Sequence, residues 1–152
     1  PDLKRTVGSA AYVLSVAQNA NHPALPVTVA MEGREEFKRK AAIVLIGNVG
    51  VVTGNIELIP GATAHDGELD VMVASPRTPL DWVRLTAKVL TRRRTEDNRM
   101  DVLRGTKVRI IAEREDAYQV DGDTEGRCSV LEAEIMPAAL LVMSPRRGGS
   151  AR

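Results

Sequence analysis

The chain has 152 residues, of which 43% are apolar and 27% charged, and its formal net charge is +1. This length and composition are typical of one globular domain with a sizeable core, and they exclude a largely disordered chain. Aromatic residues make up only 3%, so the core must be aliphatic and we expect no nucleic-acid partner that needs stacking platforms. No apolar run approaches the roughly 20 residues that span a bilayer.

The first 48 residues indicate one helix followed by strands. Apolar residues recur at three- and four-residue steps over residues 2–19, which predicts an amphipathic helix that ends before Pro23. Residues 25–32 are rich in β-branched side chains and predict a strand, followed by a turn. Residues 37–48 predict one longer strand, because the first half alternates and the second half is apolar throughout.

The middle of the chain combines a glycine-rich loop, a buried strand and a second helix. Residues 47–62 predict a loop with strand fragments, and the Asp-Gly turn at 66–67 introduces a strand over 69–73. Residues 79–93 predict a helix with one apolar stripe and cations in its last turn. The stripe consists of Leu80, Val83, Ala87 and Leu90.

The rest of the chain predicts strands only, at residues 100–105, 106–113, 117–122, 129–137 and 139–145. Two helices beside many short, turn-bounded strands indicate an α+β fold, mostly β, in the form of an antiparallel β-sandwich. We expect one domain over residues 1–145 and a disordered tail over 146–152. The arginine run at 92–94 is expected to be a solvated helix end, with contact to anionic lipid headgroups as the alternative.

Two acidic stretches each allow two interpretations. In "HDGELD" (65–70), Asp66-Gly67 is an ordinary turn signal, but three carboxylates and a glycine also suit Mg²⁺, which takes oxygen ligands. In "YQVDGDTEG" (118–126), Asp121-Gly122 is either the end of a hairpin or a catalytic carboxylate at a strand end. Zinc motifs, nucleotide-binding glycine fingerprints and Ser-His-Asp sets are absent from the sequence.

The order of these pieces resembles a known family. The segments "KRTVGSAAYVL", "VLIGNVGVVTGNIELIPGATAHDGELDVMV", "YQVDGD" and "PAALLVMSP" follow one another with a basic-ended helix between the second and third. Together they resemble the C-terminal half of a bacterial lipid kinase of the diacylglycerol kinase and sphingosine kinase superfamily, from about Lys4 to Pro145. The resemblance implies a two-domain parent whose N-terminal domain binds ATP through a GGDGT-type motif. This chain has no GGDGT and begins without Met, so we expect a fragment that contains no nucleotide-binding residues.

The resemblance also implies roles for single residues. Asp121 matches the family's general base, and Asp123 is a supporting carboxylate where the family has the longer Glu. Asp66 matches the carboxylate that holds a structural Mg²⁺, together with the backbone carbonyls of Thr63 and Glu68.

Two further positions match the family. We expect Asp70 to anchor the following strand, and Asn48 to brace the backbone.

The implied activity is transfer of phosphate from ATP to a lipid hydroxyl, with diacylglycerol as the default acceptor and a sphingoid base or another lipid alcohol as the alternative. We expect the fragment to be inactive alone, and to need its own N-terminal domain as partner. A cytoplasmic enzyme in peripheral contact with the inner face of the membrane would follow, and a homodimer would be compatible with an exposed apolar face. Two alternatives stay open: a non-catalytic lipid-binding or regulatory β-sandwich, and a small kinase related to NAD kinases.

Overall fold

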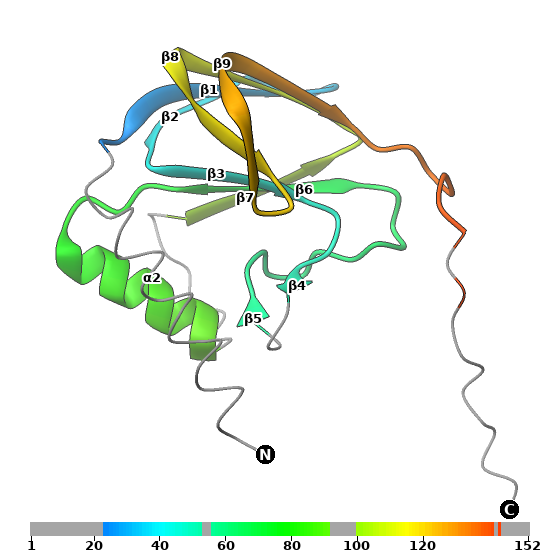
Figure 1. Cartoon of the computed structure of the whole chain (residues 1–152), viewed down its shortest axis with the longest axis horizontal. Coiled ribbons are helices and arrows are strands. Elements are labelled where there is room, and N and C mark those ends of the chain that lie inside the picture. Colours follow the sequence, from blue (N-terminus) through cyan, green and yellow to red (C-terminus); the bar gives the residue numbers. More distant parts are fainter. Residues whose placement is uncertain (1–22, 53–55, 92–99, 142, 144–152) are drawn as a thin grey trace, which may run out of the picture.

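The computed structural model describes residues 23–52, 56–91, 100–141 and 143. In this part of the chain two antiparallel sheets lie face to face, and one helix, α2 (Pro79–Thr91), lies beyond the second sheet (Figure 1).

The first sheet has the order β2-β1-β8-β9, with bounds Phe37–Ala41, Leu25–Met31, Lys107–Val120 and Asp123–Glu134. The second sheet has the order β3-β6-β7, with bounds Ile43–Gly47, Leu69–Ala74 and Met100–Gly105. A small ribbon is formed by β4 (Val51–Val52) and β5 (Ile56–Glu57). The predicted fold class, a mostly β, antiparallel sandwich, is confirmed.

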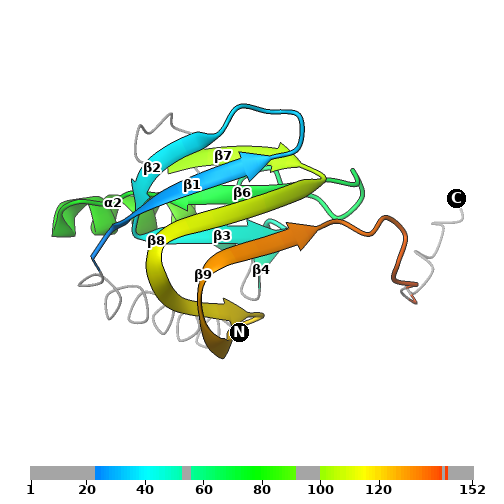
Figure 2. The ribbon, with the colours of Figure 1, turned by 90° about the horizontal axis from the view of Figure 1, so that it is seen from above.

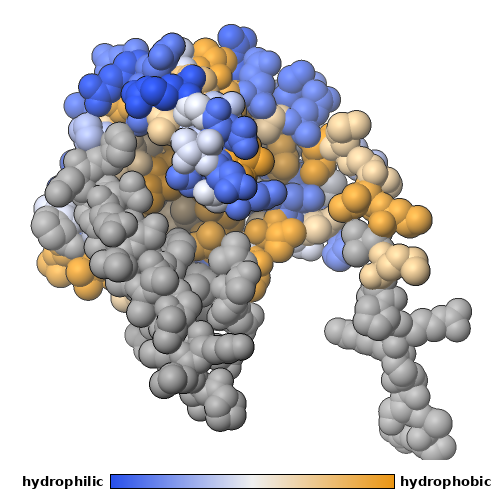
Figure 3. Space-filling model, in the orientation of Figure 1, coloured by the Kyte–Doolittle hydropathy of each residue, from blue (hydrophilic) through white to orange (hydrophobic). Residues whose placement is uncertain are grey.

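An aliphatic core fills the space between the two sheets. Its central members are Val29 of β1, Val71 and Val73 of β6, and Val108 of β8, each fully buried. Figure 2 shows the strands of the first sheet running over those of the second. The atoms over the outer face of the first sheet, at the top of Figure 3, are mostly hydrophilic. The first sheet therefore follows the pattern of one buried and one solvated face that antiparallel sheets commonly have.

The second sheet is covered on both faces, and β6 is buried along its whole length. Leu69, Val71 and Val73 contribute to the core between the sheets. The intervening residues point to the opposite face because side chains alternate along a strand. They are buried there as well, and they include the carboxylate of Asp70.

The predicted single strand over residues 37–48 is wrong, because the chain changes sheets within it. β2 pairs with β1 in the first sheet, and β3 pairs with β6 in the second. Between them, the Ala42 N–H donates to the Ala74 carbonyl at 2.9 Å. The change from alternating to continuously apolar residues in this stretch marks the change from a half-solvated sheet to a covered one.

The two strands predicted at 106–113 and 117–122 are one strand of 14 residues, β8. It pairs along its length with β9, and register irregularities lie between Ile111 and Asp116 and between Tyr118 and Gln119. Such irregularities bend a strand and disturb its alternation, which explains why the sequence pattern breaks there. No strand is present at 139–141 or at 143, so in the described part of 139–145 the predicted last strand is wrong.

Helix α2 is where the sequence predicted it, but its buried face is different. Thr78 and Asp81 form a capping box: the Thr78 N–H donates to Asp81 Oδ2 at 2.9 Å, and the Asp81 N–H donates to Thr78 Oγ1 at 3.2 Å. Asp81 and Trp82 are buried, whereas Leu80 is 55% and Val83 is 63% exposed. The capping carboxylate and the indole are thus buried, whereas Leu80 and Val83 of the predicted apolar stripe point outward.

The predictions for the helix over 2–19, the arginine run at 92–94 and the tail at 146–152 lie outside the described residues. Within the described residues, no helix combines the length and the hydropathy of a bilayer-spanning segment.

Glycines at 47 and 50 allow the segment around Ile59 to pack closely against the end of β3. A Cβ on Gly50 would lie 2.3 Å from the Ile59 carbonyl oxygen, and one on Gly47 would lie 2.9 Å from Ile59 Cδ1. The Gly50 carbonyl also accepts hydrogen bonds from the N–H groups of Leu58, at 2.7 Å, and Ile59, at 3.3 Å. The packing of this segment explains these two glycines.

The Gly50→Ala variant should be destabilised by about 1–3 kcal/mol, because its methyl group would overlap a backbone oxygen that cannot move alone. Gly105→Ala is the matched control, since its Cβ would meet only the flexible end of Met31, at 3.0 Å. Chemical denaturation of the two variants measures the difference. Equal stabilities would show that the segment around Ile59 yields easily.

Candidate functional site

The candidate site is built on a row of three paired residues across the second sheet. Asp70 of β6 lies opposite Gly47 of β3 on one side and opposite Arg104 of β7 on the other. Because residues paired across antiparallel strands point to the same face, Asp70 and Arg104 meet on the face that Ile59 covers at Gly47. The Asp70 side chain is 0% exposed and that of Arg104 is 40% exposed.

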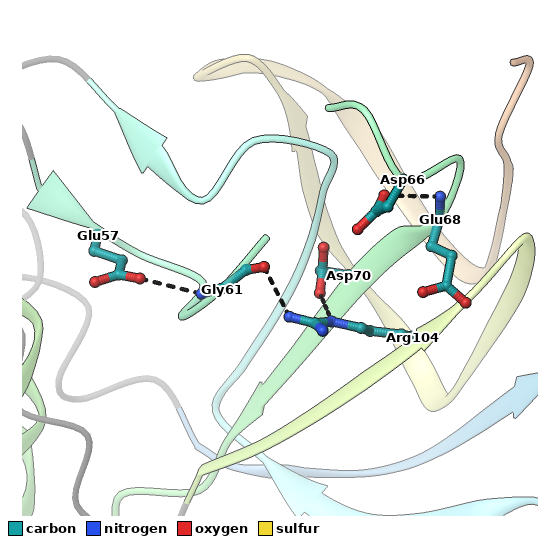
Figure 4. A network of polar contacts seen from close by, with 6 residues as sticks. All are labelled: Glu57, Gly61, Asp66, Glu68, Asp70 and Arg104. Atoms are coloured by element: carbon teal, nitrogen blue, oxygen red, sulfur yellow. Dashed lines mark hydrogen bonds and ion pairs between the residues drawn. The ribbon is translucent and has the colours of Figure 1, made fainter. Parts of the chain in front are cut away.

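The Arg104 guanidinium connects this row to the loop that precedes β6 (Figure 4). Its Nε donates to Asp70 Oδ1 at 2.6 Å, and a terminal nitrogen donates to the Gly61 carbonyl at 2.8 Å. The Gly61 N–H in turn donates to Glu57 Oε1 at 3.1 Å. Both backbone polar groups of Gly61 are therefore held, the N–H by a carboxylate and the carbonyl by a guanidinium. Asp70 was predicted to anchor its strand, and its carboxylate forms an ion pair from β6 to Arg104 of β7.

The loop between Gly61 and Asp70 contains the predicted metal ligands. Asp66 Oδ1 accepts a hydrogen bond from the Glu68 N–H at 3.1 Å, which is an Asx turn, and Gly67 has a φ of +75°. Thr63 and Asp66 are exposed and Glu68 is partly buried. The turn at Asp66-Gly67 is therefore confirmed as a turn.

The donor set of this loop fits Mg²⁺ chemically. In the described part of the chain, no group of three or more His, Cys, Asp and Glu side chains is placed to hold a metal ion. A cation would rely on the carboxylate of Asp66, on the carbonyls of Thr63 and Glu68, and on water. Mg²⁺ commonly binds through one or two carboxylates in this way and keeps several waters.

Several carboxylates surround the Arg104 guanidinium. The hydrogen bond to Asp70, followed by the attraction of the Asp70 charge, raises the pKa of Arg104, and burial opposes this. Asp66 and Glu68 add smaller contributions in the same direction. The Asp66 loop is therefore close enough to act on Arg104 electrostatically, and the region carries more negative than positive charge.

The second acidic stretch forms the end of the β8–β9 hairpin. Val120 pairs with Asp123, and the two residues between them, Asp121 and Gly122, both have positive φ angles, of 51° and 98°. This is the geometry of a type I′ turn, for which Asp-Gly is a preferred sequence. Asp121 and Asp123 are both exposed. The hairpin interpretation of this stretch therefore describes its conformation correctly, and the catalytic role of Asp121 stays a prediction.

Within this chain the two acidic stretches do not form one site. The end of the β8–β9 hairpin and the loop before β6 lie apart in both views (Figures 1 and 2). If Asp121 and Asp66 serve one reaction, another part of a longer protein must lie between them.

Sequence reasoning missed Arg104, which donates hydrogen bonds to both Asp70 and Gly61. It lies in an ordinary mixed strand, "MDVLRG", and only its pairing opposite a buried aspartate reveals its importance. Asn48 was expected to brace the backbone, but its side-chain oxygen makes no hydrogen bond within the described residues that would do so. Asn48 Oδ1 and Asp70 Oδ2 are buried, and neither has a hydrogen-bond partner in the described part of the chain.

A family model matches residues 2–144, and its description is the YegS C-terminal NAD kinase beta sandwich-like domain. The chain belongs to this family. The match agrees with the sandwich of two antiparallel sheets and with the resemblance seen in the sequence.

Relatives in other organisms agree with this assignment. Over 139 residues the chain is 27% identical to the diacylglycerol kinases of two Mycobacterium tuberculosis strains, CDC 1551 / Oshkosh and H37Rv. This alignment covers 90% of the chain but only 44% of each relative, so the chain spans less than half the length of these proteins.

Two solved structures from Bacillus anthracis str. Sterne have the same fold. The first gives a TM-score of 0.67 at 21% identity and covers 83% of this chain and 43% of that one. The second, the crystal structure of a diacylglycerol kinase, gives 0.56 at 19% identity, with 84% and 48% covered.

The turn geometry predicts how the fold tolerates changes at Asp121. Asp121→Asn should leave the free energy of unfolding within about 0.5 kcal/mol, because Asn-Gly suits a type I′ turn equally well. Asp121→Val should destabilise the chain by about 1–2 kcal/mol, since a β-branched residue is strained at positive φ. Thermal unfolding compares the two, and an Asn variant as unstable as the Val variant would show that the carboxylate itself supports the fold.

Proposed function

We propose that this chain is the C-terminal part of an ATP-dependent lipid kinase that phosphorylates a lipid hydroxyl, with diacylglycerol as the acceptor. The observation that carries the proposal is the family match over residues 2–144, together with relatives named diacylglycerol kinase that align over 90% of the chain. Because those relatives are more than twice as long, the ATP-binding part is assigned to a preceding domain of a longer parent.

Asp121 is the proposed general base. A lipid hydroxyl is weakly acidic, so a carboxylate must accept its proton as the hydroxyl oxygen attacks the γ-phosphoryl group of ATP. A two-residue turn at the end of a long hairpin presents Asp121 to solvent, where a substrate can reach it. Asp123 lies two residues further along the chain, is also exposed, and is the proposed supporting carboxylate.

The Asp66 loop is the proposed Mg²⁺ site of the C-terminal part. Asp66 would supply the carboxylate ligand, and Thr63 and Glu68 the carbonyl ligands. As the structural ion that the family resemblance implies, Mg²⁺ would cross-link the loop through these oxygen ligands when bound. The chain itself contributes the closed turn at Asp66-Gly67, which fixes the carboxylate relative to the carbonyl of Glu68.

Exposed apolar side chains after β9 support contact with another part of the parent. Large hydrophobic residues in this segment are almost fully exposed, and they are Met136, Leu140, Leu141 and Met143. Contiguous exposed apolar surface commonly marks an interaction site. We assign this segment to the contact with the preceding ATP-binding domain. A second copy of the chain is the alternative occupant, and it would make the protein a homodimer.

The proposed cellular location of the enzyme follows from its two substrates, ATP and a membrane lipid. An ATP-dependent kinase that acts on a membrane lipid would work in the cytoplasm, in peripheral contact with the inner face of the membrane.

In a parent protein with its ATP-binding domain, Asp121→Asn should lower lipid phosphorylation about 10²–10⁴-fold, the usual contribution of a general base. ATP affinity should not change, because the residue lies outside the nucleotide-binding part. Transfer of radiolabelled phosphate into diacylglycerol measures the first quantity and equilibrium ATP binding the second. Full activity of the Asn variant would remove Asp121 as the base.

The isolated 152-residue chain should transfer no phosphate from ATP to any lipid. A panel of lipid alcohols assayed with the parent, including diacylglycerol and a sphingoid base, identifies the acceptor. Lipid-dependent transfer would exclude both alternatives, the non-catalytic lipid-binding sandwich and the kinase of a non-lipid substrate. Activity of the isolated chain would contradict the two-domain assignment.

A further inference from the structure

We infer that Arg104 is the positioning residue of the Asp66 loop: its guanidinium joins the two ends of residues 61–70 and so holds the loop in one arrangement. The inference depends on the proposed function in one respect, namely that the loop serves as a Mg²⁺ site. The geometry that carries it is independent of any activity.

The two acceptors of Arg104 lie at opposite ends of the loop. Gly61, at the start, offers its carbonyl at 2.8 Å, and Asp70, at the end, offers Oδ1 at 2.6 Å. Arg104 belongs to neither end, since it lies 43 residues from Gly61 and 34 from Asp70 in the chain. Figure 4 shows its guanidinium between the two, with Asp66 and Glu68 on the same side of β6. One side chain therefore closes the loop.

Apart from those of Arg104, no hydrogen bond among the described residues ties loop residues 62–68 to the two sheets, although Ala62 also packs against Gly50. The hydrogen bonds made there by loop residues 62–68 are local, from the Ala62 N–H to the Ile59 carbonyl and from the Glu68 N–H to Asp66 Oδ1. Glu57 holds the Gly61 N–H, but it belongs to the adjoining ribbon strand β5. In the described part of the chain, Arg104 therefore supplies the hydrogen bonds that hold the Asp66 loop relative to β6 and β7.

Pairing of the strands does not explain the second hydrogen bond of Arg104. β6 and β7 already pair through six successive residues, from Leu69–Gly105 to Ala74–Met100. The ion pair compensates the buried charge of Asp70 and could be made by any cation. The hydrogen bond to Gly61 adds nothing to that compensation and acts only on the loop. A guanidinium makes both bonds at once because its donors form a rigid planar fork, which the single ammonium group of Lys lacks.

The charge and the fork of Arg104 can be separated experimentally with two variants of the full 152-residue chain. Arg104→Lys keeps the positive charge beside Asp70 but removes the fork, whereas Arg104→Gln removes both. Amide hydrogen exchange, followed by mass spectrometry in the absence of metal, reports local opening of residues 61–68 separately from opening of the sheets.

A matched control exists at a second arginine. Arg39 of β2 donates to Asp101 of β7 and to Ser75 Oγ, so it also joins two acceptors from different elements, but away from the Asp66 loop. Arg39→Lys should therefore leave exchange in residues 61–68 unchanged.

For Arg104→Lys we expect exchange in residues 61–68 about tenfold faster, which corresponds to the loss of one hydrogen bond, with exchange in β6 and the melting temperature near those of the unchanged chain. Arg104→Gln should accelerate exchange in both the loop and β6. Unchanged loop exchange in the Lys variant, or acceleration spread evenly over the chain, would show that Arg104 acts only as a counter-ion.

A second measurement tests the link to the metal. Calorimetric titration with Mg²⁺ alone should show about tenfold weaker binding for Arg104→Lys than for Arg39→Lys. Equal Mg²⁺ affinities of the two variants would show that Arg104 does not position the Asp66 loop for metal binding. A different outcome would separate the two proposals. If the parent protein phosphorylates no lipid but the loop of Arg104→Lys exchanges faster, the proposed function is wrong and the positioning role of Arg104 stands.

Discussion

The buried carboxylate of Asp70 is the constraint on which the second sheet depends. It lies in a strand with no exposed residue, and a charge taken out of water must be compensated where it lies. Arg104 provides that compensation from the neighbouring strand, and Gly47 leaves room on the other side, where Ile59 packs. The register of three strands and the course of the loop before β6 are thereby linked to one ion pair. The hydrogen bond from Arg104 to Gly61 extends the link to the Asp66 turn.

Local patterns predicted most of the elements but not where the chain changes sheets. Strands β1, β6 and β7 and helix α2 were predicted nearly at their observed bounds. Both their patterns of apolar residues and the turn residues beside them mark these elements in the sequence. The change of sheet at Ala42 was missed, since no glycine or proline marks it and both halves favour extended backbone. The orientation of α2 was missed for a different reason. A capping carboxylate and a tryptophan are buried there, and the partners of the carboxylate, the N–H groups of Arg77 and Thr78, precede the helix, which periodicity does not record.

The candidate site shows the same division between local and non-local information. The turns at Asp66-Gly67 and Asp121-Gly122 were visible in the sequence, because positive φ angles require particular residues over a short span. Arg104 was not visible, since its importance arises from a residue 34 positions away. The family resemblance supplied roles for the aspartates, and only the structure shows that the two turns lie apart. Sequence reasoning thus found the carboxylates and missed the cation that joins the Asp66 loop to the second sheet.

Turn chemistry and catalysis place compatible demands on Asp121, which is why neither the pattern nor the conformation alone distinguishes them. A type I′ turn selects Asp or Asn before glycine, and a general base requires Asp on a rigid, accessible support. The hairpin meets both demands, because paired strands hold the turn on either side and leave its first residue in solvent. Asn would satisfy the turn and fail as a base, so the carboxylate oxygen is the only part of the side chain that the fold does not require. The group that this oxygen would contact in the proposed reaction has to come from outside the hairpin. If Asp121 is the general base, as proposed, the chemistry of this domain would depend on the surface that the rest of a longer parent places against the hairpin.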